Sequence, residues 1–131
     1  MAWVEIFAVF FVCHLVGDYL LQTDWQARNK PRGLGRDRVA RKALVSHIAS
    51  YTLAFVPALV WIGDEIGAAE AVGIGALVAT PHLIQDDGRL LKAYIGRVKG
   101  DAALTERSVA AAADQTFHIL ALFLTALLAA S

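Results

Sequence analysis

The feature that most constrains the fold of this chain is a set of four apolar stretches, each close to the length needed to cross a membrane. A spanning helix needs about 20 mostly apolar residues. Of the 131 residues, 57% are hydrophobic, which exceeds the apolar fraction of most soluble proteins. We therefore predict an all-α fold, a four-transmembrane-helix bundle that forms a single integral-membrane domain over residues 1–131. The predicted spans run from about Trp3 to Leu21, Ala43 to Ile62, Ala68 to Ile84 and Val109 to Ala130.

All the basic residues lie in two of the segments that connect these stretches, and the third connection, GDEIGAAE, carries only acidic charge. Lys and Arg accumulate in cytoplasmic loops of membrane proteins. We therefore predict a multi-pass membrane protein with both basic segments cytoplasmic and both termini outside. The first segment holds Arg28, Lys30, Arg32, Arg36, Arg38, Arg41 and Lys42, and the second holds Arg89, Lys92, Arg97, Lys99 and Arg107.

The second basic segment also has an apolar periodicity. In GRLLKAYIGRVK, apolar residues recur near helical spacing with basic residues between them. This pattern predicts a cytoplasmic amphipathic helix after the third span, lying at the membrane surface in contact with anionic lipids. Twelve Lys and Arg balance twelve Asp and Glu over the whole chain, so we expect no nucleic acid among the partners.

Ionisable side chains recur inside the apolar stretches at four-residue spacing, which places them on one side of a helix. Given the predicted topology, all of them lie toward the cytoplasmic ends of their spans. We therefore predict that they converge in one cluster in the cytoplasmic half of the bundle. The residues are His14 and Asp18 in the first stretch, His47 in the second, His82 and Asp86 in the third, and Asp114 and His118 in the fourth.

The first and third stretches also share a short repeat, HLVGD and HLIQD, and each is followed by a stretch with one histidine. Two helix hairpins in the same orientation would be related by an axis along the membrane normal. The repeat predicts that the two hairpins bring two sets of His and Asp side chains face to face.

An ionisable residue in hydrocarbon costs at least about 2.5–3.5 kcal/mol on insertion scales, so such residues pair with something inside the bundle. Imidazole and carboxylate groups together suit a divalent metal such as Zn, Mn or Fe, and two ions sharing bridging carboxylates can activate water. The predicted metal ligands are His14, Asp18, His47, His82, Asp86, Asp114 and His118.

Two alternatives to a metal site stay open. One is a metal-free network of His–Asp hydrogen bonds, and the other is a proton or ion pathway.

Four segments, HLVGDYLLQTDWQARNK, LVSHIASYT, HLIQD and DQTFHI, resemble a family of small bacterial and phage membrane proteins known only as a domain of unknown function. The likeness covers most of the chain, and its most specific part is the opening H-x-x-G-D-x-x-x-Q-T-D-W. The resemblance implies a four-helix fold in the bacterial inner (cytoplasmic) membrane and a role for the polar residues above, but no reaction. A looser likeness, in architecture and His/Asp content, is to membrane-bound metal-dependent hydrolases. The third stretch departs from the expected pattern by continuing as DDGRLL, so Asp87 is an alternative to Asp86.

The leading functional hypothesis is an integral membrane metalloprotein that hydrolyses a lipid-linked or amphiphilic substrate entering from the inner leaflet. The candidate catalytic residues are Asp18, Gln22 and Asp114, and the basic residues expected to bind the substrate headgroup are Arg28, Lys30 and Arg89. One alternative is a non-catalytic scaffold or subunit with a His/Asp polar or metal core, acting as a homo-oligomer or with a partner membrane protein. A second alternative is a small ion or solute transporter.

Overall fold

The computed structural model describes all 131 residues, and it contains helices and no strands, which confirms the all-α prediction. There are seven α-helices and two short π-helical segments, η1 and η2. In chain order the elements are α1 (Trp3–Leu15), η1 (Val16–Leu20), α2 (Asp24–Asn29), α3 (Arg38–Ile66), α4 (Ala68–Asp86), α5 (Arg89–Tyr94), η2 (Ile95–Lys99), α6 (Ala102–Thr105) and α7 (Arg107–Ala129).

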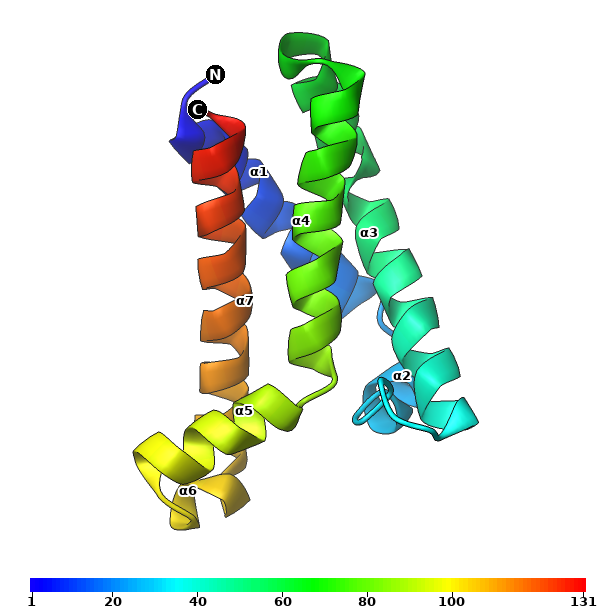
Figure 1. Cartoon of the computed structure of the whole chain (residues 1–131), viewed down its shortest axis with the longest axis vertical. Coiled ribbons are helices and arrows are strands. Elements are labelled where there is room, and N and C mark those ends of the chain that lie inside the picture. The colour runs from blue at the N-terminus through cyan, green and yellow to red at the C-terminus, as the bar shows by residue number, and fades with distance from the viewer.

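Four long rods form a bundle, as Figure 1 shows: α1 with its continuation η1, then α3, α4 and α7. Each rod contacts its two neighbours in the cyclic order α1, α3, α4, α7. Both termini lie at one end of the bundle, and α2, α5 and α6 lie at the other end (Figure 1). The two hairpins, α1–α3 and α4–α7, therefore run in the same direction, as the repeat predicts.

Three helical segments are long and apolar enough to cross a membrane: Trp3–Leu20, Arg38–Ile66 and Arg107–Ala129. Helix α4 coincides with the third predicted span but is not among them. Its 19 residues end in the polar sequence HLIQD, which lowers its apolar character. The fourth span therefore stays a prediction, whereas three candidate spans are found.

The bundle interior divides into an apolar half and a polar half. The apolar half lies toward the termini, where the first turns of α1 and α4 meet the last turns of α3 and α7, and the polar half holds the histidines. The buried apolar cluster consists of Ile6, Phe10, Tyr51, Phe55, Ala58, Ile62, Ile74, Val78, Leu122, Ala126 and Ala129.

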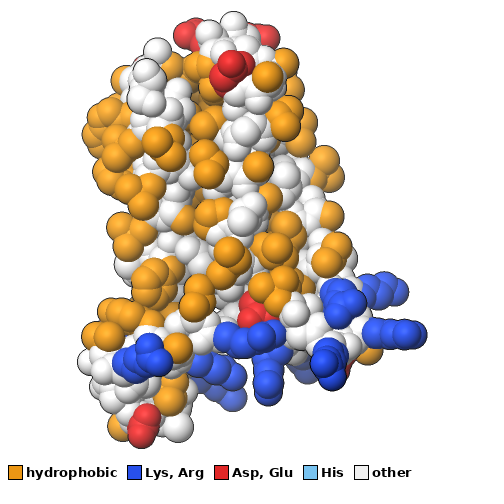
Figure 2. Space-filling model, in the orientation of Figure 1, with side chains coloured by type: hydrophobic (Ala, Val, Ile, Leu, Met, Phe, Trp, Pro, Cys, Tyr) orange, Lys and Arg blue, Asp and Glu red, His pale blue; other side chains and the backbone are white.

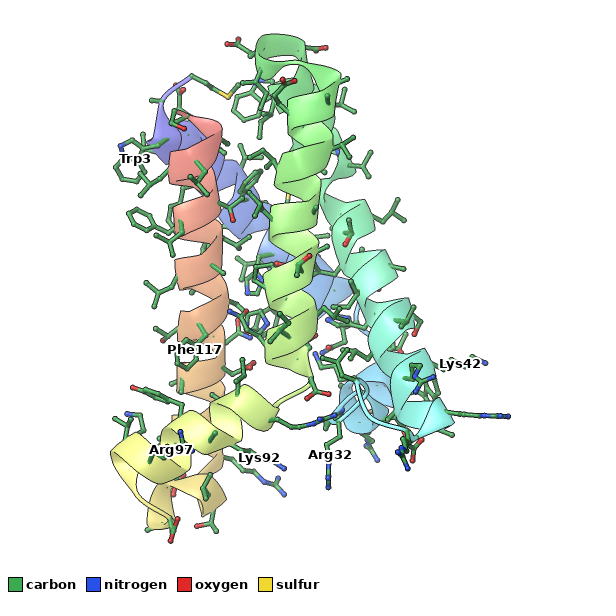
Figure 3. The ribbon with its side chains drawn as sticks, viewed as in Figure 1. Trp3, Arg32, Lys42, Lys92, Arg97 and Phe117 are labelled. Atoms are coloured by element: carbon green, nitrogen blue, oxygen red, sulfur yellow. The ribbon has the colours of Figure 1, made fainter.

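Charge separates along the bundle axis in the same way. In Figure 2 the Lys and Arg side chains gather at one end, the opposite end shows acidic but no basic side chains, and the flanks between are mostly apolar. Figure 3 places Arg32 and Lys42 of the first basic segment at the same end of the bundle as Lys92 and Arg97 of the second, and Trp3 at the other end. Both basic segments thus lie at one end, which we call the basic end.

Local sequence explains how the chain turns at the basic end. Thr23 begins α2 with a reciprocal cap: its hydroxyl accepts the backbone N–H of Gln26 at 3.2 Å, and the Gln26 amide oxygen accepts the N–H of Thr23 at 2.9 Å. The Asp37 carboxylate accepts the N–H groups of Val39 and Ala40 and so starts α3. The Gln26 amide then donates to Ser46 at 3.2 Å and ties α2 to α3.

Glycine at position 17 allows η1 to approach α3 closely. A Cβ atom added at Gly17 would lie 2.6 Å from Cδ2 of Tyr51 and 3.3 Å from the Tyr51 Cα. Because the obstacle includes backbone, the two helices would have to move apart to accept any larger side chain.

We therefore expect Gly17→Ala to destabilise the protein by about 1–3 kcal/mol, as overpacking of a helix contact does. Thermal unfolding of the detergent-purified protein measures the change. Gly73→Ala in α4 is the matched control, because a Cβ at Gly73 meets nothing within 4 Å and alanine favours a helix by up to about 1 kcal/mol. Equal unfolding temperatures for the two variants would contradict the close approach of η1 and α3.

Candidate metal centre

Each of the four rods contributes one histidine to the polar half of the bundle. His14 of α1, His47 of α3, His82 of α4 and His118 of α7 are all at most 2% exposed. The ring centroids of His47 and His82 are 5.3 Å apart, those of His82 and His118 are 4.5 Å apart, and those of His14 and His118 are 5.6 Å apart. The predicted convergence of the histidines is therefore present.

Two imidazole nitrogens lie close to two carboxylate oxygens within this cluster: Nε2 of His47, Nε2 of His82, Oδ1 of Asp18 and Oδ2 of Asp86. The two imidazole nitrogens are 3.1 Å apart. Each of them lies 3.0–3.2 Å from both carboxylate oxygens. We call these four residues the primary set.

The five distances that involve an imidazole nitrogen are close to those between the ligands of a tetrahedral metal ion. Zinc binds imidazole nitrogen and carboxylate oxygen at about 2.0–2.1 Å, so ligands in a regular tetrahedron lie about 3.3 Å from one another. The observed separations of 3.0–3.2 Å are slightly shorter. Small outward movements of the side chains would accommodate the ion, with no change in the helices that carry them.

Hydrogen bonding alone leaves the primary set poorly satisfied. The buried Oδ1 of Asp18 accepts no hydrogen bond, although two imidazole nitrogens lie within 3.2 Å. The Nδ1 atoms of His47 and His82 are also buried without a partner. In the tautomer that carries its proton on Nδ1, each Nε2 atom presents a lone pair that a cation can accept.

His118 is held with one ring nitrogen turned toward the primary set. Its Nδ1 donates to the backbone carbonyl of Asp114 at 2.8 Å, which leaves a lone pair on Nε2. That Nε2 is buried, has no hydrogen-bond partner, and lies 3.4 Å from Oδ1 of Asp86. A backbone carbonyl orients many metal-binding histidines in this way, and two acceptors facing one another favour a cation between them.

His14 differs because both of its ring nitrogens have hydrogen-bond partners. Nε2 donates to the amide oxygen of Gln115 at 2.9 Å, and Nδ1 accepts the hydroxyl of Tyr51 at 3.1 Å. The Tyr51 ring also stacks on His82, with the ring centroids 3.5 Å apart. Tyr51 was not among the residues predicted from the sequence. Its position one helical turn after His47 is the only signal, since an aromatic residue there also suits the apolar core.

A local change of helix type directs Asp18 into the primary set. Asp18 lies in the π-helical segment η1, where the turn is wider than in an α-helix. Its carboxylate is 3.7 Å from His14, the partner that four-residue spacing suggests, but 3.2 Å from His47 and His82. The sequence pattern identified the residue, and the π-turn determines which histidines it meets.

The other two candidate catalytic residues lie at the edge of the cluster. Asp114 keeps 31% of its side chain exposed, and its carboxylate is 3.8 Å from Nδ1 of His118. The Gln22 amide nitrogen lies 3.4 Å from the backbone carbonyl of Asp18. Neither side chain joins the primary set.

The three basic residues expected to bind a substrate headgroup pair with three different acidic residues. Arg28 is exposed and pairs with Asp24 on its own helix at 2.9 Å. The Lys30 ammonium reaches into the cluster, donating to Oδ2 of Asp86 at 2.9 Å and to the Gln22 amide oxygen. Arg89 pairs instead with Asp87 at 2.9 Å.

Asp86 and Asp87 make different contacts, which decides which of the two carboxylates in DDGRLL belongs to the histidine cluster. The Asp87 carboxylate accepts the backbone N–H of Leu34 at 2.9 Å and pairs with Arg89. Its backbone carbonyl accepts the N–H of Arg32 at 2.9 Å. Asp87 thus anchors the loop before α3, and Asp86 alone faces the histidines.

We expect Tyr51→Phe to lower the free energy of unfolding by about 1–3 kcal/mol, because it removes the hydroxyl donor and leaves the buried Nδ1 of His14 unpaired. Chemical or thermal unfolding in detergent measures the loss. Tyr19→Phe, at a side chain that is 62% exposed, serves as the control and should leave stability unchanged. Equal stability of the Tyr51 variant and the wild type would show that this hydrogen bond does not hold His14.

Residues 6–131 match a family described as a protein of unknown function, DUF3307. No curated protein and no solved structure matches the chain.

Proposed function

The chain belongs to the DUF3307 family of proteins of unknown function, and we propose that it is an integral membrane metalloprotein with a divalent metal ion at the primary set. The observation that carries the proposal is that two imidazole nitrogens 3.1 Å apart each lie 3.0–3.2 Å from an oxygen of Asp18 and an oxygen of Asp86. Zinc suits two imidazoles and two carboxylates in a tetrahedron, and Mn or Fe suits the same donor types.

Charge balance supports the same proposal. Asp18 and Asp86 are 9% and 6% exposed, and two buried carboxylates side by side repel one another strongly. One divalent cation neutralises both, whereas neutral imidazole adds no charge. His118 beside the second oxygen of Asp86 offers a further ligand, either to the same ion or to a second one.

For the membrane arrangement we propose four spans, with α4 as the fourth, in the bacterial inner membrane. The basic end is then cytoplasmic and both termini are outside, by the preference of basic residues for the cytoplasmic side. Helix α5 would lie at the cytoplasmic surface. In this arrangement the metal ion lies in the inner half of the bilayer.

The reaction that we propose is hydrolysis of an amphiphilic or lipid-linked substrate. A metal ion supplies activated water and polarises an ester or phosphate oxygen. A mostly apolar pocket of about 130 Å³ leads to Asp114 between α4, α5 and α7, lined by Gln85, Leu90, Leu91, Asp114 and Phe117. The amide oxygen of Gln85 is buried there without a partner, so it can accept a hydrogen bond from a substrate, and Asp114 can hold a proton beside His118.

A non-catalytic scaffold is the second candidate, and one observation favours it. The primary set already supplies four protein ligands to one ion, and a closed tetrahedron is typical of structural metal sites. Loss of a substrate-dependent phenotype in Asp114→Asn and Gln85→Ala, with metal content and fold kept, would favour the enzyme. Normal function of both variants would favour the scaffold.

Metal analysis of the detergent-purified protein tests the proposal. We expect about one tightly bound divalent ion per chain, and loss of that ion in His47→Ala, His82→Ala and Asp86→Ala. Asp87→Asn is the matched control at the neighbouring carboxylate and should keep the ion, because Asp87 contacts only the loop and Arg89. A folded wild-type protein that binds no divalent metal would exclude both the hydrolase and the metal scaffold.

Lys30 supplies a sharper test between a metal ion and a metal-free network. Its ammonium lies 2.9 Å from Oδ2 of Asp86 and would compete with a metal ion for that oxygen. We therefore expect Lys30→Gln to raise zinc affinity about tenfold, which corresponds to about 1.4 kcal/mol. In a metal-free network Lys30 would be the counter-ion of Asp86, so the same change would destabilise the protein and create no metal affinity. Competition titration with a zinc indicator, paired with thermal unfolding, separates the two.

A further inference from the structure

A second polar site lies at the basic end, formed by residues that take no part in the histidine cluster. It is a pocket of about 400 Å³ between the loop that precedes α3 and the start of α5. Three of the residues that line it are arginines, and we call it the arginine pocket. Its lining is Pro31, Arg32, Gly35, Arg36, Asp37, Ala40 and Arg89.

The pocket contains cationic and neutral donors that the protein leaves unused. The guanidinium groups of Arg32 and Arg36 form no ion pair and no hydrogen bond within the protein. The backbone N–H groups of Arg36 and Asp37 likewise donate to no protein acceptor. Unpartnered guanidinium groups beside free amides make a site for an anion, and arginine pairs with phosphate through two parallel hydrogen bonds.

The two nearby carboxylates, Asp37 and Asp87, offset part of this charge but are fewer than the three arginines of the pocket. Asp37 accepts the N–H groups of Val39 and Ala40 at the start of α3. Asp87 pairs with Arg89 and accepts the N–H of Leu34. The Arg41 guanidinium donates to the carbonyl of Gly35 at 2.7 Å and adds a further positive charge behind the loop.

The loop that presents Arg32 is held in a fixed shape. Arg32 has a φ of 64°, in the left-handed region that favours glycine. Its N–H donates to the carbonyl of Asp87, and its own carbonyl accepts the N–H of Gly35, both at 2.9 Å. Because glycine adopts this conformation without strain, the backbone itself does not require arginine at this position.

The position of the pocket points to the source of the anion. It opens at the basic end, where the apolar flanks of the bundle stop (Figure 2). Leu34 and Val39, next to the pocket, are 50% and 52% exposed. Apolar side chains and free arginines at one level match the boundary between the acyl chains and the phosphates of a lipid layer.

We propose that the arginine pocket binds a phosphate group, supplied by an anionic phospholipid of the surrounding membrane. Arg32 and Arg36 hold the phosphate oxygens, the free amides of the loop add hydrogen bonds, and Arg89 closes the pocket from α5. This site is separate from the primary set and does not depend on a metal ion.

Native mass spectrometry of the detergent-solubilised chain, titrated with phosphatidylglycerol, tests the proposal. We expect one lipid to bind, and the Arg32→Gly, Arg36→Gln double variant to bind it at least tenfold more weakly. Diacylglycerol with the same acyl chains lacks the phosphate and should not bind. Binding of inorganic phosphate is measured separately. If the wild type binds phosphate, the double variant does not, and neither binds the lipid, then the pocket is a phosphate site whose ligand comes from solution.

The matched control is the Arg38→Gln, Lys42→Gln double variant, which removes the same charge from exposed positions outside the pocket. We expect it to bind phosphatidylglycerol like the wild type. Arg32→Gly relieves a left-handed backbone, so the unfolding temperature of the single variant should not fall, and its loss of binding then reflects the side chain. An equal loss of affinity in the pocket and control variants, or no loss in either, would overturn the proposal.

Discussion

The structure depends on the compensation of two carboxylates buried inside an apolar helical bundle. Asp18 and Asp86 present oxygens to the same pair of imidazole nitrogens, in surroundings where an isolated charge is costly. Lys30 reaches one of the two carboxylates, and the remaining positive charge has to come from a protonated histidine or from a bound cation. A divalent cation at the primary set would satisfy both carboxylates and both imidazoles together, with ligand positions that three of the rods already fix.

The rest of the bundle holds these side chains in place. Gly17 lets η1 lie against Tyr51, Tyr51 and Gln115 orient His14, and the carbonyl of Asp114 orients His118. Asp87 then ties the end of α4 to the loop before α3. The apolar core at the other end packs the same four rods, so the position of the site follows from the packing of the whole bundle.

The sequence predicts much of this arrangement because two kinds of pattern are strong. Long apolar stretches indicate the helices, and ionisable residues inside them at four-residue spacing indicate which faces meet. His47, with no acidic residue four positions away, was found because it was the only histidine in its stretch. Asp86 and Asp87 could not be distinguished, because their difference depends on the helix end and on the loop that Asp87 binds.

Other features depended on packing that no local pattern encodes. A contact predicted from four-residue spacing assumes a regular α-helix. The π-turn at Val16–Leu20 departs from that geometry and moves Asp18 from His14 toward His47 and His82. Lys30 was expected to hold a headgroup, but the fold of α2 brings its ammonium to Asp86. Arg32 and Arg36 were identified only as part of a basic segment, since the pocket that they share with Arg89 forms across 50 or more positions of the chain.

X-ray absorption spectroscopy of the zinc-loaded protein tests the central claim most directly. The account predicts a four-coordinate ion with nitrogen and oxygen ligands at about 2.0–2.1 Å, and with the outer-shell scattering of two imidazole rings. A six-coordinate ion bound mainly by water, a sulfur ligand from Cys13, or scattering from fewer than two imidazoles would contradict it.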